Sequence, residues 1–358
     1  MRARSGQKAT DMEAIAKALG VSKTTVHYAL RNKGRVSEAT RKRVLKVAAE
    51  MGYRPNLLAR SLRTQRTDTV GVVLVTLTSS YHAHLLEGID GIAQAFEHSI
   101  LVACSYRSAA KERQLVEVLL EKGVDGLIVA PADPDENADY YRRLVEDGVH
   151  LVFVDRYIPG VNVDSVSTDN LTGAYRAVEH LAALGRKRIA VLTTISGERR
   201  STSVEARIAG CARALQEAGL EPAIVLGPDV PDKLPEEEFA YDSVREHLRS
   251  SRKRFDAVFA MHDGLAYGAI EAILESGLRV PEDVAVVGFD DQDPSAYIHP
   301  PLTTVRQPAR SSGEEAVRIL FRRLRDPEMP PPRQRVSLEP ELIVRKSCGA
   351  ALAREKTA

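Results

Sequence analysis

Polar and charged side chains stand at the ends of several apolar runs in this 358-residue chain. Asp155 and Arg156 end one such run, and Asp290 follows another. A carboxylate can accept hydrogen bonds from two neighbouring sugar hydroxyls, while a guanidinium fork donates to ring and hydroxyl oxygens. Together they suit a polyol ligand. The candidate pocket residues are Ser79, Tyr81, His82, Asp155, Arg156, Arg207, His262 and Asp290.

No catalytic constellation accompanies these residues. The sequence has no Walker loop, nucleophile elbow or HExxH motif, and Gly88-x-x-Gly91 falls inside an expected helix rather than a phosphate loop. His82 and His84 are two residues apart, but no carboxylate or cysteine stands at ligand spacing beside them. We therefore expect neither an enzyme nor a metal or cofactor site.

Charge is distributed unevenly along the chain. Residues 1–67 hold 16 Lys or Arg against 4 Asp or Glu, a net charge of +12, whereas residues 68–358 carry −11. One end is thus suited to a polyanion, and the remainder is an acidic body with a different task. This asymmetry favours a nucleic-acid-binding head over a merely solvated basic tail.

The basic segment has the pattern of a helix-turn-helix. The sequence at 10–13 predicts a capping box at the start of the first helix. In it the Thr10 hydroxyl accepts a hydrogen bond from the Glu13 amide, and the Glu13 carboxylate reaches back to Thr10. Gly20 supplies the turn, a second helix covers 22–30, and Ser37 caps a third. The expected inward-facing residues are Val26 and Leu30 in the second helix, and Val44, Val47, Ala48 and Met51 in the third.

From Val70 onward the pattern changes to alternating strands and helices. Short apolar runs separated by amphipathic stretches indicate parallel sheets covered on both faces, and their total length favours two lobes. The expected strands are 70–75, 100–104, 126–130, 151–155, 188–193, 256–261 and 284–289. The expected helices include 83–97, 109–122, 170–184, 203–218 and 264–276. Ligands of such sheets bind beyond the carboxyl ends of the strands.

The compartment follows from what the sequence lacks. The first ten residues contain charges but no apolar core of a signal peptide, and no apolar run reaches the roughly 20 residues of a membrane span. The cysteines (Cys104, Cys211 and Cys348) are scattered and predict no disulfide framework. We expect a soluble, cytoplasmic protein that acts at the nucleoid.

From Thr10 to about Cys348 the chain resembles the LacI/GalR family of bacterial transcription regulators. In the head the resemblance lies in Gly20-Val21-Ser22-x-x-Thr25-Val26, Val36-Ser37-x-x-Thr40-Arg41 and Gly52-Tyr53-x-Pro55-Asn56-x-x-Ala59-Arg60-Ser61-Leu62. In the body it lies in Val124-Asp125-Gly126, Phe153-Val154-Asp155-Arg156, Val287-Gly288-Phe289-Asp290-Asp291 and Pro301-Leu302-Thr303-Thr304-Val305. It implies a homodimer that binds operator DNA and has a core like that of periplasmic sugar-binding proteins.

The resemblance places the second helix of the head in the major groove of DNA. The family's base-reading positions correspond to Lys23, Thr24 and Tyr28, and its phosphate anchors to Ser22, Thr25 and Asn32. Lys23 can donate to guanine O6 or N7. Tyr28 replaces the common Arg, so the half-site can differ from those of relatives. For His27, a phosphate contact and simple exposure both remain open.

The resemblance also implies a hinge helix near residues 56–63. Leu62 corresponds to the leucine that wedges into the minor groove at the operator's centre; the alternative is an ordinary packing residue. Ala59 is small enough to let the helix approach the groove floor. The expected hinge contacts are Asn56, Ala59, Arg60 and Leu62.

In the body, the resemblance makes Asp290 and Arg207 the firmest ligand contacts. The alternative for Asp290 is a loop cap, a role that Asp291 could also fill. His82 and His262 stand where the family commonly has other residues. Two histidines in the pocket wall favour a more acidic ligand, such as a uronate or a sugar phosphate.

The predicted organisation has a head at 1–55, a hinge and linker at 56–67, a core at 68–348 and a tail at 349–358. The core divides into an N-subdomain (68–167 and 307–335) and a C-subdomain (168–306 and 336–348). The tail has no heptad repeat, so we expect a dimer rather than a coiled-coil tetramer. Two alternatives stay open: control by a protein co-regulator, and a plain sugar-binding protein, which the basic head opposes.

Overall fold

The computed structural model describes residues 11–30, 34, 36–53, 66–133, 135–193, 201–221, 224–226, 236–250, 255–326 and 334–350. The chain forms two compact units, one ending at Thr67 and the other beginning at Asp68. No helix among these residues is long and apolar enough to cross a membrane.

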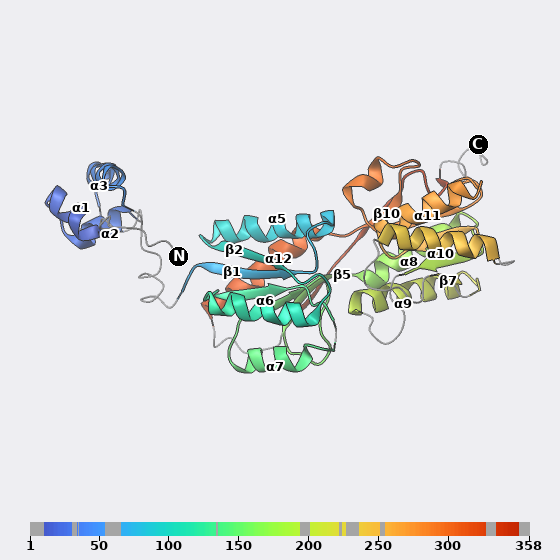
Figure 1. Ribbon diagram of the computed structural model, residues 1–358, viewed down its shortest axis with the longest axis horizontal. Coiled ribbons are helices and arrows are strands. Elements are labelled where there is room, and N and C mark those ends of the chain that lie inside the picture. The colour runs from blue at the N-terminus through green and yellow to red at the C-terminus, as the bar shows by residue number, and fades with distance from the viewer. Residues whose placement is uncertain are drawn as a thin grey trace, which may run out of the picture. The chain divides into compact units, whose positions relative to one another are not determined.

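The described residues of the first unit form three helices around a small apolar core (Figure 1). Its helices are α1 (Met12–Leu19), α2 (Lys23–Leu30) and α3 (Glu38–Glu50). Gly20 ends α1 with a φ of 64°, a left-handed conformation that costs glycine little because it has no Cβ. The buried residues are Ile15, Ala16, Val26, Ala29, Val44 and Ala48.

Two details of the head differ from the prediction. The N-cap of α1 is Asp11, whose carboxylate accepts from the Ala14 amide at 2.8 Å; Thr10 lies outside the described residues. Aspartate caps a helix as well as serine or threonine does, because its oxygen reaches the same amides. Met51 follows the end of α3 and is 36% exposed, so the buried stripe ends at Ala48.

The second unit contains two six-stranded sheets and confirms the predicted two-lobed α/β core (Figure 1). The first sheet has the order β11 (Arg335–Leu338), β5 (Asp164–Thr168), β4 (Leu151–Val154), β3 (Gly126–Val129), β1 (Thr69–Leu74), β2 (Ser99–Cys104). The second has the order β12 (Glu341–Ile343), β10 (Thr303–Arg306), β9 (Ala285–Asp290), β8 (Ala257–Ala260), β6 (Ile189–Leu192), β7 (Ile224–Leu226). All neighbours pair in parallel except β10 and β12, which are antiparallel.

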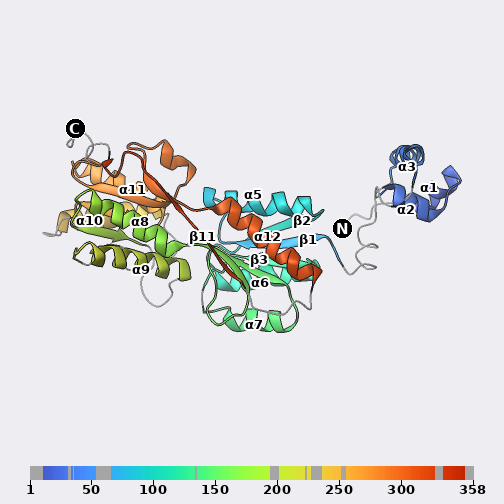
Figure 2. The ribbon, with the colours of Figure 1, turned by 180° about the vertical axis from the view of Figure 1, so that it is seen from behind.

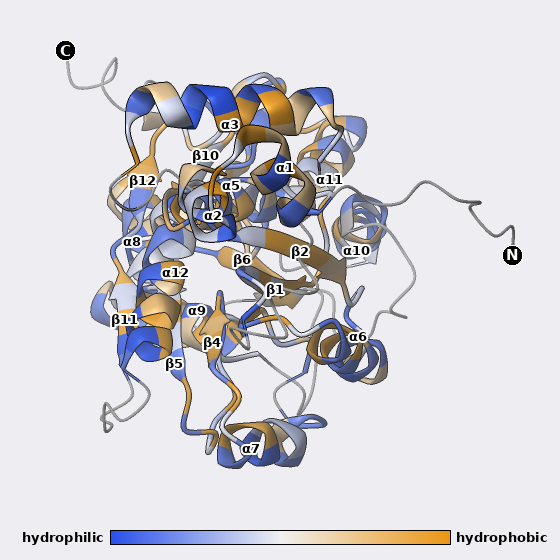
Figure 3. Ribbon diagram, turned by 90° about the vertical axis from the view of Figure 1, so that its left-hand side faces the viewer, coloured by the Kyte–Doolittle hydropathy of each residue, from blue (hydrophilic) through white to orange (hydrophobic). Residues whose placement is uncertain are grey.

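Side chains that point alternately to the two faces of the first sheet pack against two separate layers of helices. In β1, Val72 and Leu74 pack with α5 (Ser80–Ala95) and α12 (Ala309–Arg325). Val73, between them, packs on the other face with α6 (Ala109–Glu121) and α7 (Ala138–Glu146). Because strand side chains point alternately to the two faces, a fully apolar strand supplies both layers. Figure 2 shows these helices from behind, and Figure 3 shows that β4 is largely hydrophobic and α7 partly hydrophilic.

Helices cover the second sheet as well, around one continuous apolar core. They are α8 (Asn170–Ala183), α9 (Thr202–Glu217), α10 (Glu236–Ser250) and α11 (Asp263–Glu275), with a short 3₁₀ turn at Asp293–Ala296.

Close packing of α5 against α12 explains one glycine in each helix, Gly88 and Gly313. A Cβ built on Gly88 would lie 2.1 Å from the Arg310 carbonyl oxygen of α12, and one built on Gly313 would lie 2.1 Å from the Leu85 carbonyl oxygen. Only glycine permits this approach of two backbones. Gly88 is therefore a packing residue, whereas a Cβ on Gly91 would meet nothing within 4 Å.

The chain passes between the two sheets three times: after β5, after β10 and after β11. The returning segment in the first sheet extends to Leu338 rather than ending at 335, because Arg335–Leu338 pairs with β5. The first two passages are linked directly. The Thr168 hydroxyl donates to the Gln307 side-chain oxygen at 2.7 Å, and both residues are buried.

Candidate ligand pocket and nucleic-acid interface

A cavity of about 470 Å³ lies at the carboxyl ends of strands from both lobes of the core. All eight residues selected from the sequence line it: Ser79, Tyr81, His82, Asp155, Arg156, Arg207, His262 and Asp290. The lining also includes Val75, Thr76, Thr78, Tyr106, Arg107, Ser203, Glu237, Gly264, Gln292 and Gln307. A concave site with a few convergent polar groups is typical of small-molecule binding.

The first lobe contributes a closed ion pair. Asp155 follows β4 in a left-handed conformation (φ 67°), and its Oδ2 accepts from Arg156 Nε at 2.9 Å and from Nη2 at 2.7 Å. Burial is the largest influence on the pKa of the Asp155 carboxyl and by itself would raise it, but Arg156, His82 and Arg207 together hold that pKa below its usual value. Asp155 is therefore a buried anion neutralised by the next residue.

The second lobe contributes a looser group around Asp290. This residue ends β9 with a φ of 123°, and its Oδ1 accepts from Gln307 Nε2 at 2.7 Å. His262 Nδ1 lies 3.4 Å from its Oδ2, and Arg207 Nη1 lies 3.8 Å from its Oδ1. The second carboxylate thus has an imidazole and a guanidinium nearby at distances longer than ordinary hydrogen bonds.

Arg207 lies in α9 and is held by groups other than the carboxylates. Its Nε donates to the Asn170 side-chain oxygen at 2.8 Å, and its Nη1 donates to the Met261 carbonyl at 2.5 Å. The guanidinium carbon lies 3.7 Å from the centre of the Phe289 ring. Burial lowers the pKa of this guanidinium, and the charges of Asp290 and Asp155 oppose that change. The surroundings fix the orientation of the fork.

Two buried side chains of the first turn of α5 have no hydrogen-bond partner among the described residues. They are Tyr81, through its hydroxyl, and His82, through both ring nitrogens. Burial raises the pKa of Tyr81 well above its usual value and lowers the pKa of His82. Buried polar groups without partners are rare, because each forfeits its hydrogen bonds to water. A ligand in the cavity would satisfy these atoms.

Sequence reasoning missed several lining residues. Gln307 is the most informative, since it joins Asp290 of the pocket to Thr168 of the first passage between lobes. The one feature of the sequence that could have identified Gln307 is its position directly after the segment that forms β10. Arg107 and Tyr106 follow β2, where the search for polar residues at strand ends could have found them.

Asp291, considered as a loop cap, has a different role. Its Oδ2 accepts from Arg306 Nε at 2.7 Å, and its Oδ1 lies 2.7 Å from Arg345 Nη2. The loop after β9 is instead held by Asp263, which accepts from the Gln292 amide at 2.8 Å and the Ser295 hydroxyl at 2.6 Å. Asp290 is therefore the aspartate of this loop that lines the cavity.

The head presents the predicted polar residues along α2. Ser22 precedes this helix; its Oγ accepts from the Thr25 amide at 3.0 Å and lies 2.8 Å from the Thr25 hydroxyl. Lys23 and Thr24 are exposed, and Lys23 Nζ lies 3.7 Å from Glu13. Tyr28 is 43% exposed, and His27 is partly exposed. The remaining predicted contacts (Asn32, Asn56, Ala59, Arg60 and Leu62) lie outside the described residues.

Two family profiles match the chain. Residues 11–56 match "Bacterial regulatory proteins, lacI family", and residues 178–348 match "Periplasmic binding protein-like domain". The chain is 32% identical to the HTH-type transcriptional regulator RegA of Clostridium saccharobutylicum, over 95% of this chain and 99% of that one. It is 31% identical to the HTH-type transcriptional repressor PurR of Histophilus somni, over 93% and 97%.

Solved structures of transcription regulators are similar to this chain as well. The lac repressor dimer bound to operator and the anti-inducer ONPF has a TM-score of 0.81 and 27% identity, covering 95% of this chain and 99% of that one. The complex of the transcriptional regulator CelR with cellobiose has a TM-score of 0.68 and 30% identity, covering 94% and 99%.

Proposed function

Because the chain belongs to the lacI family of bacterial regulatory proteins, we propose that it is a transcriptional repressor controlled by a small polar effector. The head binds operator DNA, and the effector occupies the cavity between the core lobes. Two protomers of a homodimer read the two halves of a nearly palindromic operator. Its place of action is the nucleoid in the cytoplasm.

One observation carries the effector site. The unsatisfied Tyr81 hydroxyl and His82 ring nitrogens line the same cavity as Asp290 and Arg207. A sugar or sugar derivative carries hydroxyls that can both donate and accept hydrogen bonds. Such hydroxyls can bond to the neutral Tyr81 hydroxyl, to the Asp290 carboxylate and to the Arg207 guanidinium within one cavity. The cavity lining also holds three guanidiniums (Arg107, Arg156 and Arg207) and three carboxylates (Asp155, Glu237 and Asp290). Because Arg156 is paired with Asp155, an acidic group on the ligand would be received by Arg107 or Arg207.

The passages between lobes support an allosteric role for this site. Asp290 accepts from Gln307, which accepts from Thr168, so a pocket carboxylate is bonded to the connection through which the lobes would move. A ligand that prefers one arrangement of the lobes shifts the population toward it. By linkage, the effector and the operator then change each other's affinity by the same factor.

The effector site is tested by thermal unfolding of the full chain with sugars, sugar acids and sugar phosphates. A ligand at 100 times its dissociation constant adds about 2.7 kcal/mol to the free energy of unfolding. Tyr81→Phe removes only the unsatisfied hydroxyl, so we expect unchanged stability without ligand and a smaller ligand-induced shift. A panel without any shift would remove the small-molecule effector and favour a protein co-regulator; binding of neutral sugars alone would refute the acidic ligand.

The DNA-binding role is tested with Leu62→Ala in operator and nonspecific-DNA binding assays. If Leu62 wedges into the minor groove, the ratio of specific to nonspecific affinity falls by about tenfold or more. Leu45→Ala is the matched control, because Leu45 is an exposed leucine of α3 in the same unit. Equal losses of specific and nonspecific binding in Leu62→Ala would refute the wedge.

A further inference from the structure

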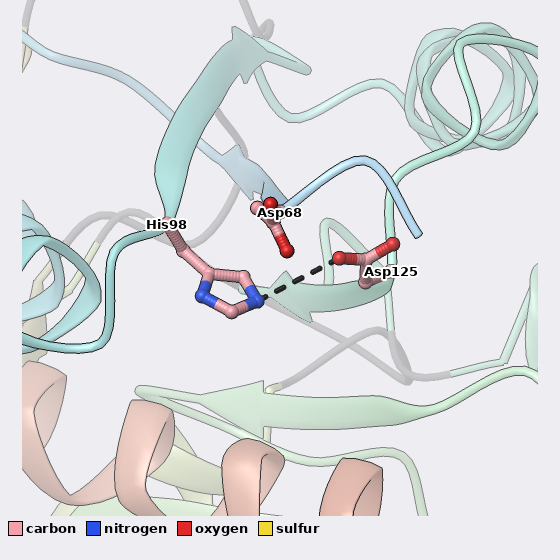
Figure 4. A group of neighbouring side chains, drawn as sticks. All are labelled: Asp68, His98 and Asp125. Atoms are coloured by element: carbon pink, nitrogen blue, oxygen red, sulfur yellow. Dashed lines mark ion pairs between the residues drawn. The ribbon is translucent and has the colours of Figure 1, made fainter. Parts of the chain in front are cut away.

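A second group of titratable side chains lies at the amino ends of strands in the first sheet, whereas the pocket lies at the carboxyl ends. Asp68, His98 and Asp125 directly precede β1, β2 and β3, whereas the pocket residues follow the carboxyl ends of strands. One imidazole nitrogen and one oxygen from each carboxylate lie within 4.8 Å of one another (Figure 4). Six-residue strands separate the two ends by about 20 Å.

The parallel register holds these three positions together. The Asp68 carbonyl accepts from the Ser99 amide at 2.9 Å, and the Asp125 amide donates to the Thr69 carbonyl at 2.8 Å. The three residues therefore sit on neighbouring strands of one hydrogen-bonded sheet. Their approach depends on the sheet ladder rather than on mobile loops.

The orientation of His98 is also defined. Its Nδ1 lies 2.7 Å from the Phe96 carbonyl, which can only accept, so Nδ1 carries the proton. The ring packs against Phe321, with ring centres 4.5 Å apart. Nε2 then faces Asp125 Oδ2 (Figure 4). A histidine whose other nitrogen donates to a backbone carbonyl is the arrangement that orients metal ligands in proteins.

The distances suit an ion between the side chains. His98 Nε2 and Asp125 Oδ2 are 3.6 Å apart, beyond the usual hydrogen-bond range of about 3.2 Å. Two ligands bound at about 2.1 Å to one tetrahedral ion are separated by about 3.4 Å. The Asp125 side chain is only 5% exposed and that of His98 18%. Two carboxylates there favour a divalent cation.

We propose that Asp68, His98 and Asp125 form a binding site for a divalent transition-metal ion of the zinc class. Imidazole nitrogen with two carboxylate oxygens is a donor set that zinc accepts, and the imidazole disfavours magnesium and calcium. The candidate ligand atoms lie within 4.8 Å of one another, so the side chains must draw together slightly to reach ligand distance from one ion. The bound ion joins the first residue of the core to the starts of β2 and β3. This proposal does not depend on the proposed function.

The test is a zinc titration of the chelator-treated full chain, followed by calorimetry and thermal unfolding. Zinc should raise the melting temperature of the unaltered chain by about 5 °C at 100 times its dissociation constant. His98→Gln and Asp68→Asn should each weaken zinc binding by at least about tenfold. His84→Gln is the matched control, because the 44% exposed His84 also lies beside a carboxylate, 3.9 Å from Asp293.

Loss of binding in His98→Gln with retention in His84→Gln supports the site. Absence of zinc binding, or equal binding by all variants, overturns it. If His98→Gln does not fold, judged by circular dichroism, the partly exposed Asp68→Asn decides in its place. Magnesium binding as tight as zinc binding would also contradict the proposed donor set.

Discussion

The two lobes each bring an aspartate and an arginine to the cavity, but they pair them differently. In the first lobe Asp155 and Arg156 are adjacent in sequence, and two nitrogens of the arginine bind one carboxylate oxygen. In the second lobe Asp290 comes from β9 and Arg207 from α9, and their closest atoms are 3.8 Å apart. The same residue types thus form a closed pair and an open one.

This difference separates two tasks. Asp155 and Arg156 satisfy each other, so their main contribution is a neutral, ordered wall. Asp290 and Arg207 are positioned by other groups, Gln307 for the former and Asn170 and Met261 for the latter. Their remaining hydrogen-bonding capacity is available to a ligand, and a positioned group loses little entropy on binding. We expect the closed pair, Asp155 and Arg156, to contribute mainly to the free energy of unfolding. We expect the open pair, Asp290 and Arg207, to contribute mainly to the affinity for the ligand.

The largest effect is expected from Arg156→Met. Removing the arginine leaves the buried Asp155 carboxylate without its bidentate partner, so the free energy of unfolding at pH 7 should fall by about 3–5 kcal/mol. Denaturant unfolding measures this loss. The double variant Asp155→Asn/Arg156→Met should regain much of it, because no buried charge is then left uncompensated. A double variant as unstable as the single one would show that the pair is not closed.

A smaller effect, on binding, is expected from Asp290→Asn. Loss of a charged acceptor removes about 1.5–3 kcal/mol of interaction, equivalent to about 10- to 100-fold in effector affinity. Calorimetry with the effector found in the ligand panel measures it. The adjacent Asp291→Asn is the control, because Asp291 pairs with Arg306 and Arg345 and does not line the cavity. Equal affinity losses in both variants would mean that Asp290 acts only through the loop.

The smallest effect is a pH dependence that reports on both pairs. Burial lowers the pKa of His82 below its ordinary value of 6.5, while Asp155 and Asp290 oppose the change. The unfolded chain therefore binds a proton that the folded chain does not, and stability should fall as the pH drops below 6.5. One group contributes at most about 1.4 kcal/mol per pH unit.

His82→Gln should flatten this slope, as measured by denaturant unfolding at several pH values in the absence of effector. His84→Gln, which changes an exposed histidine of the same helix, serves as the reference. If both variants keep the slope of the unaltered chain, another group is responsible for the pH dependence.

Much of the fold was predictable because its signals are local. Apolar runs such as 126–130 and 151–155 identify strands buried on both faces, and the strands β3 and β4 lie there. The predicted strands omitted β5, β7, β10, β11 and β12, which are polar, short or at the edge of a sheet. Their pairing depends on neighbours far along the chain, which a local pattern does not contain.

The candidate pocket was predictable in outline for a related reason. Parallel strands bring their carboxyl ends to one edge, so polar residues after different strands converge even when the chain separates them widely. Asp155 and Asp290 were selected in this way and line one cavity. Gln307 was not, because its importance comes from two partners, Asp290 and Thr168, that only the folded chain places beside it.

The sequence by itself determined the kinds of element, the basic head, the two-lobed core and the strand ends at which a ligand would bind. Charge and hydrophobic periodicity are properties of short segments, so they can be read without knowing the fold. The tertiary structure decided which aspartate of the pair at 290 and 291 lines the cavity, and it brought Asp68, His98 and Asp125 together. Both outcomes depend on strand register and backbone conformation, because these set the direction of each side chain and the distance between residues remote in sequence.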